Sequence, residues 1–76
     1  MNRLQLKALL LDSISHYKNG MHMAPNYKQV KNTFCNMVGV STRTSSKKMI
    51  DLIYCVYVDN GLKEEAQQTL KRFNLI

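Results

Sequence analysis

The chain has 76 residues, of which 11 are Lys or Arg and 5 are Asp or Glu, so its net charge is +6. Apolar residues make up 45% of it, which excludes a disordered chain and is typical of one folded domain covering residues 1–76. A domain of this size buries only about 60% of its unfolded surface. Its stability is therefore marginal without a cross-link or a partner.

No stretch of the sequence predicts a membrane segment. The longest apolar run, 52–58, is far shorter than a spanning helix requires. The short run 8–11 is interrupted by Asp12 and lacks the features of a signal peptide. We therefore expect a cytoplasmic protein, in a bacterial host cell if the resemblance described below holds.

The spacing of apolar residues predicts two helices in the first half of the chain. The first spans residues 2–18 and stops at Gly20, and the second follows a cap at Asn26 and stops at Gly39. Their apolar stripes are Leu6, Leu10, Ile14 and Tyr17, widened by Leu4, Leu9 and Leu11, and then Tyr27, Val30, Phe34, Met37 and Val38.

Two further helices are predicted in the second half. The third begins at Ser45 or Ser46 and runs to about Asp59, although the β-branched and aromatic content of 52–58 leaves a strand as the alternative. The fourth spans 62–73, with acidic residues in its first turn and basic residues in its last, as the helix dipole favours. The expected fold is all-α, a compact bundle of four short helices.

The third helix is apolar nearly all round, and such a helix must be buried on every side. Three short helices cannot enclose it fully, which predicts a homodimer with this helix near the interface. The alternative is a monomer in which it is the central helix. The expected interface residues are Ile53, Tyr54, Tyr57, Val58, Leu75 and Ile76.

The cysteines and histidines do not form a metal-binding pattern. His16 and His22 are six positions apart, whereas structural zinc ligands usually come in closer pairs. Cys35 and Cys55 are interpreted as small core residues, with a disulfide between them as the alternative. We expect no metal, no cofactor, no small-molecule substrate and no enzymatic activity.

The charge is concentrated in the middle of the chain. No acidic residue occurs between residues 13 and 50, so the whole excess of positive charge lies there. Such a basic patch is typical of proteins that bind a polyanion, either nucleic acid or an acidic protein surface, although a solvated surface is the simpler alternative. The expected contacts to nucleic acid or another polyanion are Lys28, Lys31, Thr42, Arg43, Thr44, Ser46, Lys47 and Lys48. Among the tyrosines, Tyr27 is the candidate for stacking on a base, because it lies beside Lys28 and Lys31.

Residues 30–54 resemble a helix-turn-helix. Small Cys35 lies four positions before Gly39, apolar residues flank the glycine, and Ser41 is placed to open a second helix. The resemblance implies that five residues face a major groove, with Arg43 reading a guanine edge: Thr42, Arg43, Thr44, Ser46 and Lys47. The sequence departs from the motif at Ser45, where it requires an apolar anchor, and at Lys48, where it requires a small residue. In the alternative frame the third helix begins later, at Ser45 or Ser46.

From Phe34 onward the sequence shows four features in order: a phenylalanine, a Gly-Val turn, a Ser/Thr-rich loop with lysine, and an apolar helix. This order is similar to small helical modules in bacteriophage accessory proteins. The resemblance implies a phage or mobile-element setting and assigns no residue a role. Two functions therefore stay open: a basic protein that binds nucleic acid, or an inhibitor or modulator of a host protein that acts through its apolar and basic surfaces.

Overall fold

The computed structural model describes residues 2–19 and 27–76, and all of their regular structure is helical. The helices are α1 (Arg3–Asn19), α2 (Tyr27–Val38), α3 (Ser46–Asp59) and α4 (Lys63–Arg72). This confirms the all-α bundle of four helices, and it confirms helix over strand for residues 52–58. The predicted stop at Gly20 and cap at Asn26 lie outside the described residues.

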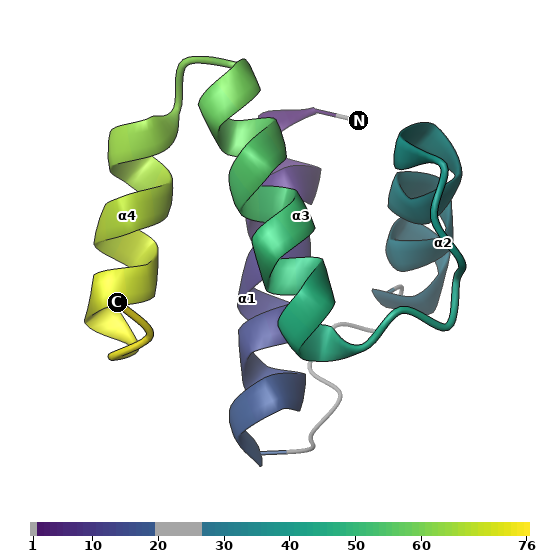
Figure 1. Cartoon of the computed structure of the whole chain (residues 1–76), viewed down its shortest axis with the longest axis horizontal. Coiled ribbons are helices and arrows are strands. Elements are labelled where there is room, and N and C mark those ends of the chain that lie inside the picture. The colour runs from purple at the N-terminus through teal and green to yellow at the C-terminus, as the bar shows by residue number, and fades with distance from the viewer. Residues whose placement is uncertain (1, 20–26) are drawn as a thin grey trace.

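The central layer of the molecule is the pair of α1 and α3 (Figure 1). The other two helices flank this pair, with α4 against α3 and α2 against α1. In the view of Figure 1, α1 and α4 run downward while α2 and α3 run upward. One end of the bundle therefore collects the last turns of α1 and α4 and the first turns of α2 and α3.

The core is built from the predicted stripes. Its largest fully buried side chains come from three helices: Leu9, Leu10 and Ile14 of α1, Phe34 of α2, and Met49, Ile53 and Tyr57 of α3. Ala66 and Leu70 add the inner face of α4. The prediction that Leu4 lies on the buried face of the first helix is wrong, because this residue is 78% exposed.

The helix ends follow local signals. The Ser45 hydroxyl accepts a hydrogen bond from the backbone N–H of Lys48 at 3.3 Å and caps α3. Gly39 and Gly61 both take positive φ angles, +76° and +72°, directly after or close after a helix, where a residue with a side chain is strained.

The surplus of apolar surface on α3 is largely absorbed within one chain. Ile53 and Tyr57 are buried in the core, and Tyr54 and Val56 are half-buried beside it. This is the central position that the monomeric alternative predicts. Ile53 and Tyr57 are therefore inaccessible to a second copy. The other expected interface residues are half-buried or exposed: Tyr54, Val58, Leu75 and Ile76.

The helix-turn-helix frame beginning at Ser41 is wrong. Residues 39–45 form no helix; they leave α2 at its upper end, pass down beside it and enter α3 from below (Figure 1). The hydroxyl of Ser41 accepts from the backbone N–H of Arg43 at 3.1 Å, and its carbonyl accepts from the backbone N–H of Thr44. These local bonds hold a turn where the motif needs a helix, so the later start of α3 is confirmed.

The two cysteines have different environments. Cys35 is buried, and its thiol lies 3.7 Å from the sulfur of Met49, where α2 contacts α3. Cys55 is exposed on α3, so its interpretation as a core residue is wrong. Both are free thiols. Among the described residues, no helix has the length and apolar content to cross a membrane.

Candidate nucleic-acid interface

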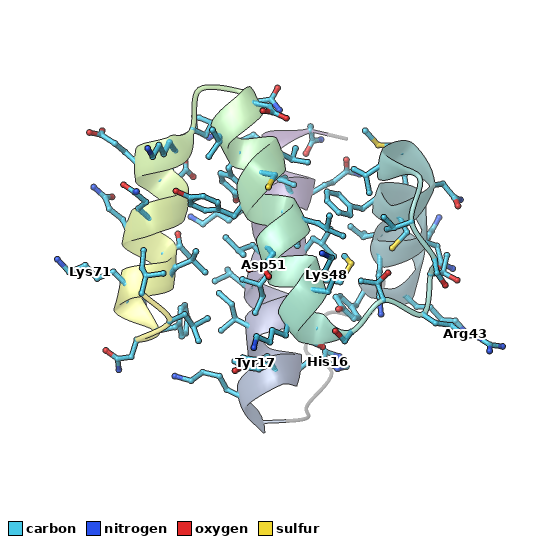
Figure 2. All side chains as sticks on the ribbon, viewed as in Figure 1. His16, Tyr17, Arg43, Lys48, Asp51 and Lys71 are labelled. Carbon is cyan, nitrogen blue, oxygen red and sulfur yellow. The ribbon has the colours of Figure 1, made fainter. Side chains whose placement is uncertain are left out.

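The predicted polyanion-binding residues gather at one end of the bundle. Lys28 and Lys31 lie in the first two turns of α2, and Lys47 and Lys48 lie in the first turn of α3. Arg43 lies late in the connecting loop and extends outward near the same end (Figure 2). Sequence segments that are separated by a loop thus form one surface because α2 and α3 run in the same direction.

Three basic residues outside the predicted set belong to this surface. The ammonium group of Lys18 donates a hydrogen bond to the backbone carbonyl of Phe73, which joins the last turn of α1 to the end of α4. Lys71 and Arg72 lie in that last turn of α4. They come after the acidic residues of the sequence, so the charge pattern along the chain could not assign them to the basic surface.

We call this surface the basic end. It comprises Lys18, Lys28, Lys31, Arg43, Lys47, Lys48, Lys71 and Arg72. All of these side chains are exposed except Lys31, which is half-buried. In Figure 2 its labelled members Arg43 and Lys71 lie at opposite sides of the molecule, whose longest dimension is 27 Å. The basic end therefore spans most of the width of the bundle.

The positive potential of the basic end comes from side chains. Two helix N-termini and two helix C-termini meet there, so the partial charges of the four helix dipoles largely cancel. The guanidinium of Arg72 lies 5.8 Å from the ring centre of Phe73 and makes a cation–π contact. Asp51, an exposed carboxylate, lies one turn after Lys47 and Lys48 on the same helix and reduces the potential locally (Figure 2).

Tyr27 is not available for stacking on a base. Its side chain is buried, its hydroxyl lies 3.5 Å from that of Ser13, and its ring stacks on His16 at a centroid distance of 4.8 Å. Burial raises the pKa of its phenol above the ordinary value. Tyr17 takes the exposed position instead: it is 47% exposed in the last turn of α1, next to Lys18.

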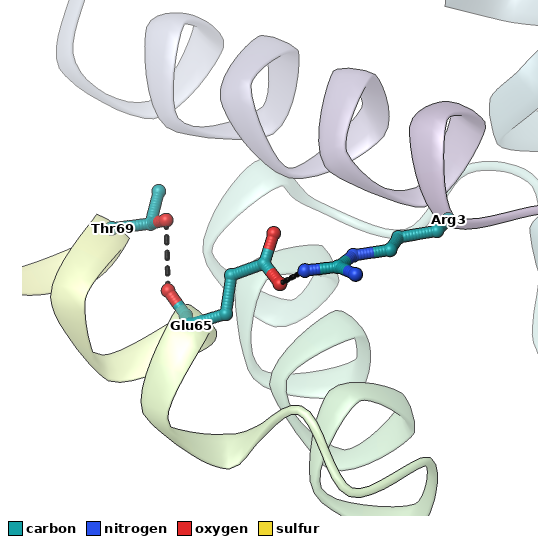
Figure 3. A network of polar contacts seen from close by, with 3 residues as sticks. All are labelled: Arg3, Glu65 and Thr69. Carbon is teal, nitrogen blue, oxygen red and sulfur yellow. Dashed lines mark hydrogen bonds and ion pairs between the residues drawn. The ribbon is translucent and has the colours of Figure 1, made fainter.

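The opposite end of the bundle carries balanced charge. Its cations are Arg3, Lys7 and Lys63, and its anions are Asp59, Glu64 and Glu65. The guanidinium of Arg3 donates to the carboxylate of Glu65, and the backbone carbonyl of Glu65 accepts from the hydroxyl of Thr69 at 2.9 Å (Figure 3). This ion pair links the first turn of α1 to that of α4.

The described residues form no metal-binding cluster. No three of their His, Cys, Asp and Glu side chains gather into a set that holds a metal ion. His22 lies outside the described residues. What the basic end offers chemically is a broad array of cationic and hydroxyl donors, which suits phosphate groups.

No protein-family model matches the chain, and no curated protein and no solved structure shows significant similarity to it.

Proposed function

We propose that the chain is a non-enzymatic protein that binds nucleic acid through its basic end. The observation that carries this proposal is the separation of charge in space. Eight cationic side chains lie on the half of the bundle that holds the last turns of α1 and α4 and the first turns of α2 and α3, while the charges of the other half are balanced. A solvated surface requires no such separation, whereas a polyanion partner gains from it by releasing counterions.

The contacts proposed for the loop and the first turn of α3 differ from those of a recognition helix. Arg43 extends from the loop, and its planar guanidinium suits a bidentate contact to a phosphate or to a guanine edge. The hydroxyls of Thr42 and Ser46 and the ammonium groups of Lys47 and Lys48 complete the phosphate-binding set. Thr44 is less suited, because its hydroxyl donates to the carbonyl of Ser41.

Tyr17 adds a ring to this surface. A half-exposed aromatic side chain beside lysines is the arrangement on which unpaired bases stack. We therefore propose that single strands bind at least as tightly as duplexes. The proposed setting, a phage or mobile element, rests on the sequence resemblance alone.

The test is fluorescence anisotropy with a labelled duplex and a labelled single strand of mixed sequence, at low and moderate salt. Lys47→Glu should weaken binding at least about tenfold, because it turns an attraction to phosphates into a repulsion. Lys63→Glu is the matched control: it makes the same change in the first turn of α4, at the opposite end, and should change affinity less than about twofold. Equal effects of the two variants, or no binding at low salt, would refute the proposal.

The second candidate function is modulation of another protein. It is favoured by the apolar side chains exposed at the end opposite the basic end, above all Met37, which is 62% exposed. A protein partner docked there should be lost on Met37→Glu and retained on Lys47→Glu. Nucleic-acid binding predicts the reverse order of effects.

A further inference from the structure

An apolar pocket opens at the end of the bundle opposite the basic end. Its volume is about 240 Å³. Its apolar lining comes from three helices and the loop before α4: Leu6, Phe34, Met37, Val38, Val56 and Leu62. Asn2, Arg3 and Asn60 form its polar edge. We call this region the pocket end. An apolar hollow with a polar edge is the kind of surface that accepts an apolar side chain from a partner.

Exposed apolar side chains gather around the same end. Met37 and Val38 are 62% and 37% exposed, although the spacing of the second helix predicted both on its buried stripe. Val58, at the same end of α3, is 39% exposed. The pocket end therefore offers both a receptor for an apolar side chain and a flexible methionine at its rim.

Charge selects the occupant. Each chain carries a net charge of +6, so two copies repel each other over most orientations. The pocket end is the exception, because Arg3, Lys7 and Lys63 are balanced there by Asp59, Glu64 and Glu65. Cations and anions at this end of the bundle also complement a second copy of the same end. A second copy that approaches by this end keeps the two basic ends as far apart as the molecule allows.

We propose that two copies of the chain associate through their pocket ends, about a two-fold axis, with Met37 of each copy entering the pocket of the other. A two-fold interface is reciprocal, so a side chain at the rim of one pocket is brought over the mouth of its partner. Methionine is unbranched and polarisable, and it fills irregular apolar hollows well. The two Met37 side chains and the two pockets are thereby removed from water together.

This interface differs from the one expected from the sequence, because Val58 alone among the residues expected there lies at the pocket end. It does not depend on the proposed binding of nucleic acid. In the resulting dimer both basic ends face outward and stay accessible.

Sedimentation equilibrium over a wide range of protein concentrations, at moderate salt, tests the proposal. The unmodified chain should show a reversible monomer–dimer equilibrium. Met37→Ala should weaken dimerisation at least about 100-fold, because each dimer loses two buried side chains. Ile76→Ala is the matched control: Ile76 is 68% exposed beside the outer face of α4, away from the pocket, and should leave dimerisation unchanged.

A second variant tests the pocket from the inside. Val56→Phe fills the hollow while leaving Met37 in place, and it should also weaken dimerisation. Mixing this chain with the Met37→Ala chain restores one of the two reciprocal contacts. The mixture should form more dimer than either variant alone, with circular dichroism confirming that both are folded.

Three results would overturn the proposal. The first is an unmodified chain that stays monomeric at every concentration, which leaves the pocket to a different protein. The second is a dimer that Met37→Ala does not weaken. The third is a mixture that forms no more dimer than its components. Fluorescence anisotropy of labelled DNA with the Met37→Ala chain tests nucleic-acid binding separately. It therefore distinguishes failure of the proposed dimer from failure of the proposed function.

Discussion

The ammonium group of Lys18 donates a hydrogen bond to the backbone carbonyl of Phe73, which lies 55 positions later in the chain. This contact joins the last turn of α1 to the end of α4. As a result, Lys71 and Arg72 belong to the same surface as the basic residues of the middle of the chain. The basic end is thus a property of the fold, wider than the basic segment of the sequence.

The first prediction concerns these two distant residues. The double variant Lys71→Ala/Arg72→Ala should reduce affinity for mixed-sequence DNA about tenfold and lower the salt dependence of binding by about one to two units, because two phosphate contacts are lost. Anisotropy titrations at several salt concentrations measure both quantities. Lys7→Ala/Lys63→Ala removes the same charge from the pocket end and should leave the salt dependence unchanged. An unchanged slope for the first variant would limit the nucleic-acid contacts to α2, the loop and α3.

The second prediction concerns the cap of α3. Ser45→Ala removes the hydroxyl that accepts from the N–H of Lys48, and should lower the free energy of unfolding by about 1 kcal/mol. Urea denaturation followed by circular dichroism measures the change. Ser46→Ala is the control, because Ser46 is the first residue of the helix, and it should change stability by less than about 0.5 kcal/mol. The reverse order would mean that Ser46 is the cap.

The third prediction separates the two thiols. Cys55 is exposed and Cys35 is buried, so a thiol reagent should modify Cys55 at once. Cys35 should react at least about 100-fold more slowly, because the reagent reaches its thiol only when the core opens locally. Cys55→Ser should remove the fast phase, and denaturant should release the slow thiol. Two fast thiols in the folded chain would contradict the placement of Cys35 between α2 and α3.

The fourth prediction concerns alkaline pH. Burial, with a smaller contribution from the charge of Glu65, raises the pKa of Tyr57 above its ordinary value of 10.0. Between that value and the raised pKa, the unfolded chain loses the proton while the folded chain keeps it. The free energy of unfolding is therefore fully retained below about pH 10 and falls as pH rises above it.

Urea denaturation between about pH 8 and about pH 11 measures this loss. Tyr57→Phe keeps the buried ring but cannot ionise, so its stability should fall less steeply over the same range. The two chains differ only at this hydroxyl, so their comparison removes the contribution of every other group. Parallel losses in both chains would show that the Tyr57 phenol does not titrate with folding.

The secondary structure could be predicted from the sequence because its causes are local. A helix forms from hydrogen bonds between residues four apart, and its ends are marked by residues such as Ser45, Asn60 and Gly61. Those signals predicted four helices with ends within about one residue of the observed ones where the structure describes them. The helix that the helix-turn-helix resemblance predicted at Ser41 does not form, because the hydroxyl and the carbonyl of Ser41 accept hydrogen bonds that stabilise a turn. A match to the motif rests on the spacing of residue types and takes no account of these bonds.

Burial, by contrast, was decided by the tertiary structure. The spacing of apolar residues predicts that a helix has a buried face. It does not predict which neighbouring helix covers each part of that face. Phe34 and Met37 lie on one predicted stripe, yet the first is buried and the second is exposed. Cys35 and Cys55 differ in the same way, because one faces Met49 across a helix contact and the other faces solvent.

The candidate site shows the same division. The sequence by itself determined the charge and most of the residues that carry it. Only the fold determined that Lys71 and Arg72 belong to the basic end and that the Tyr27 ring is buried. The fold also determined that an apolar pocket opens at the opposite end of the bundle. The physical reason is that helix formation depends on neighbours a few positions away, whereas a surface depends on which helix ends the packing of the core brings together.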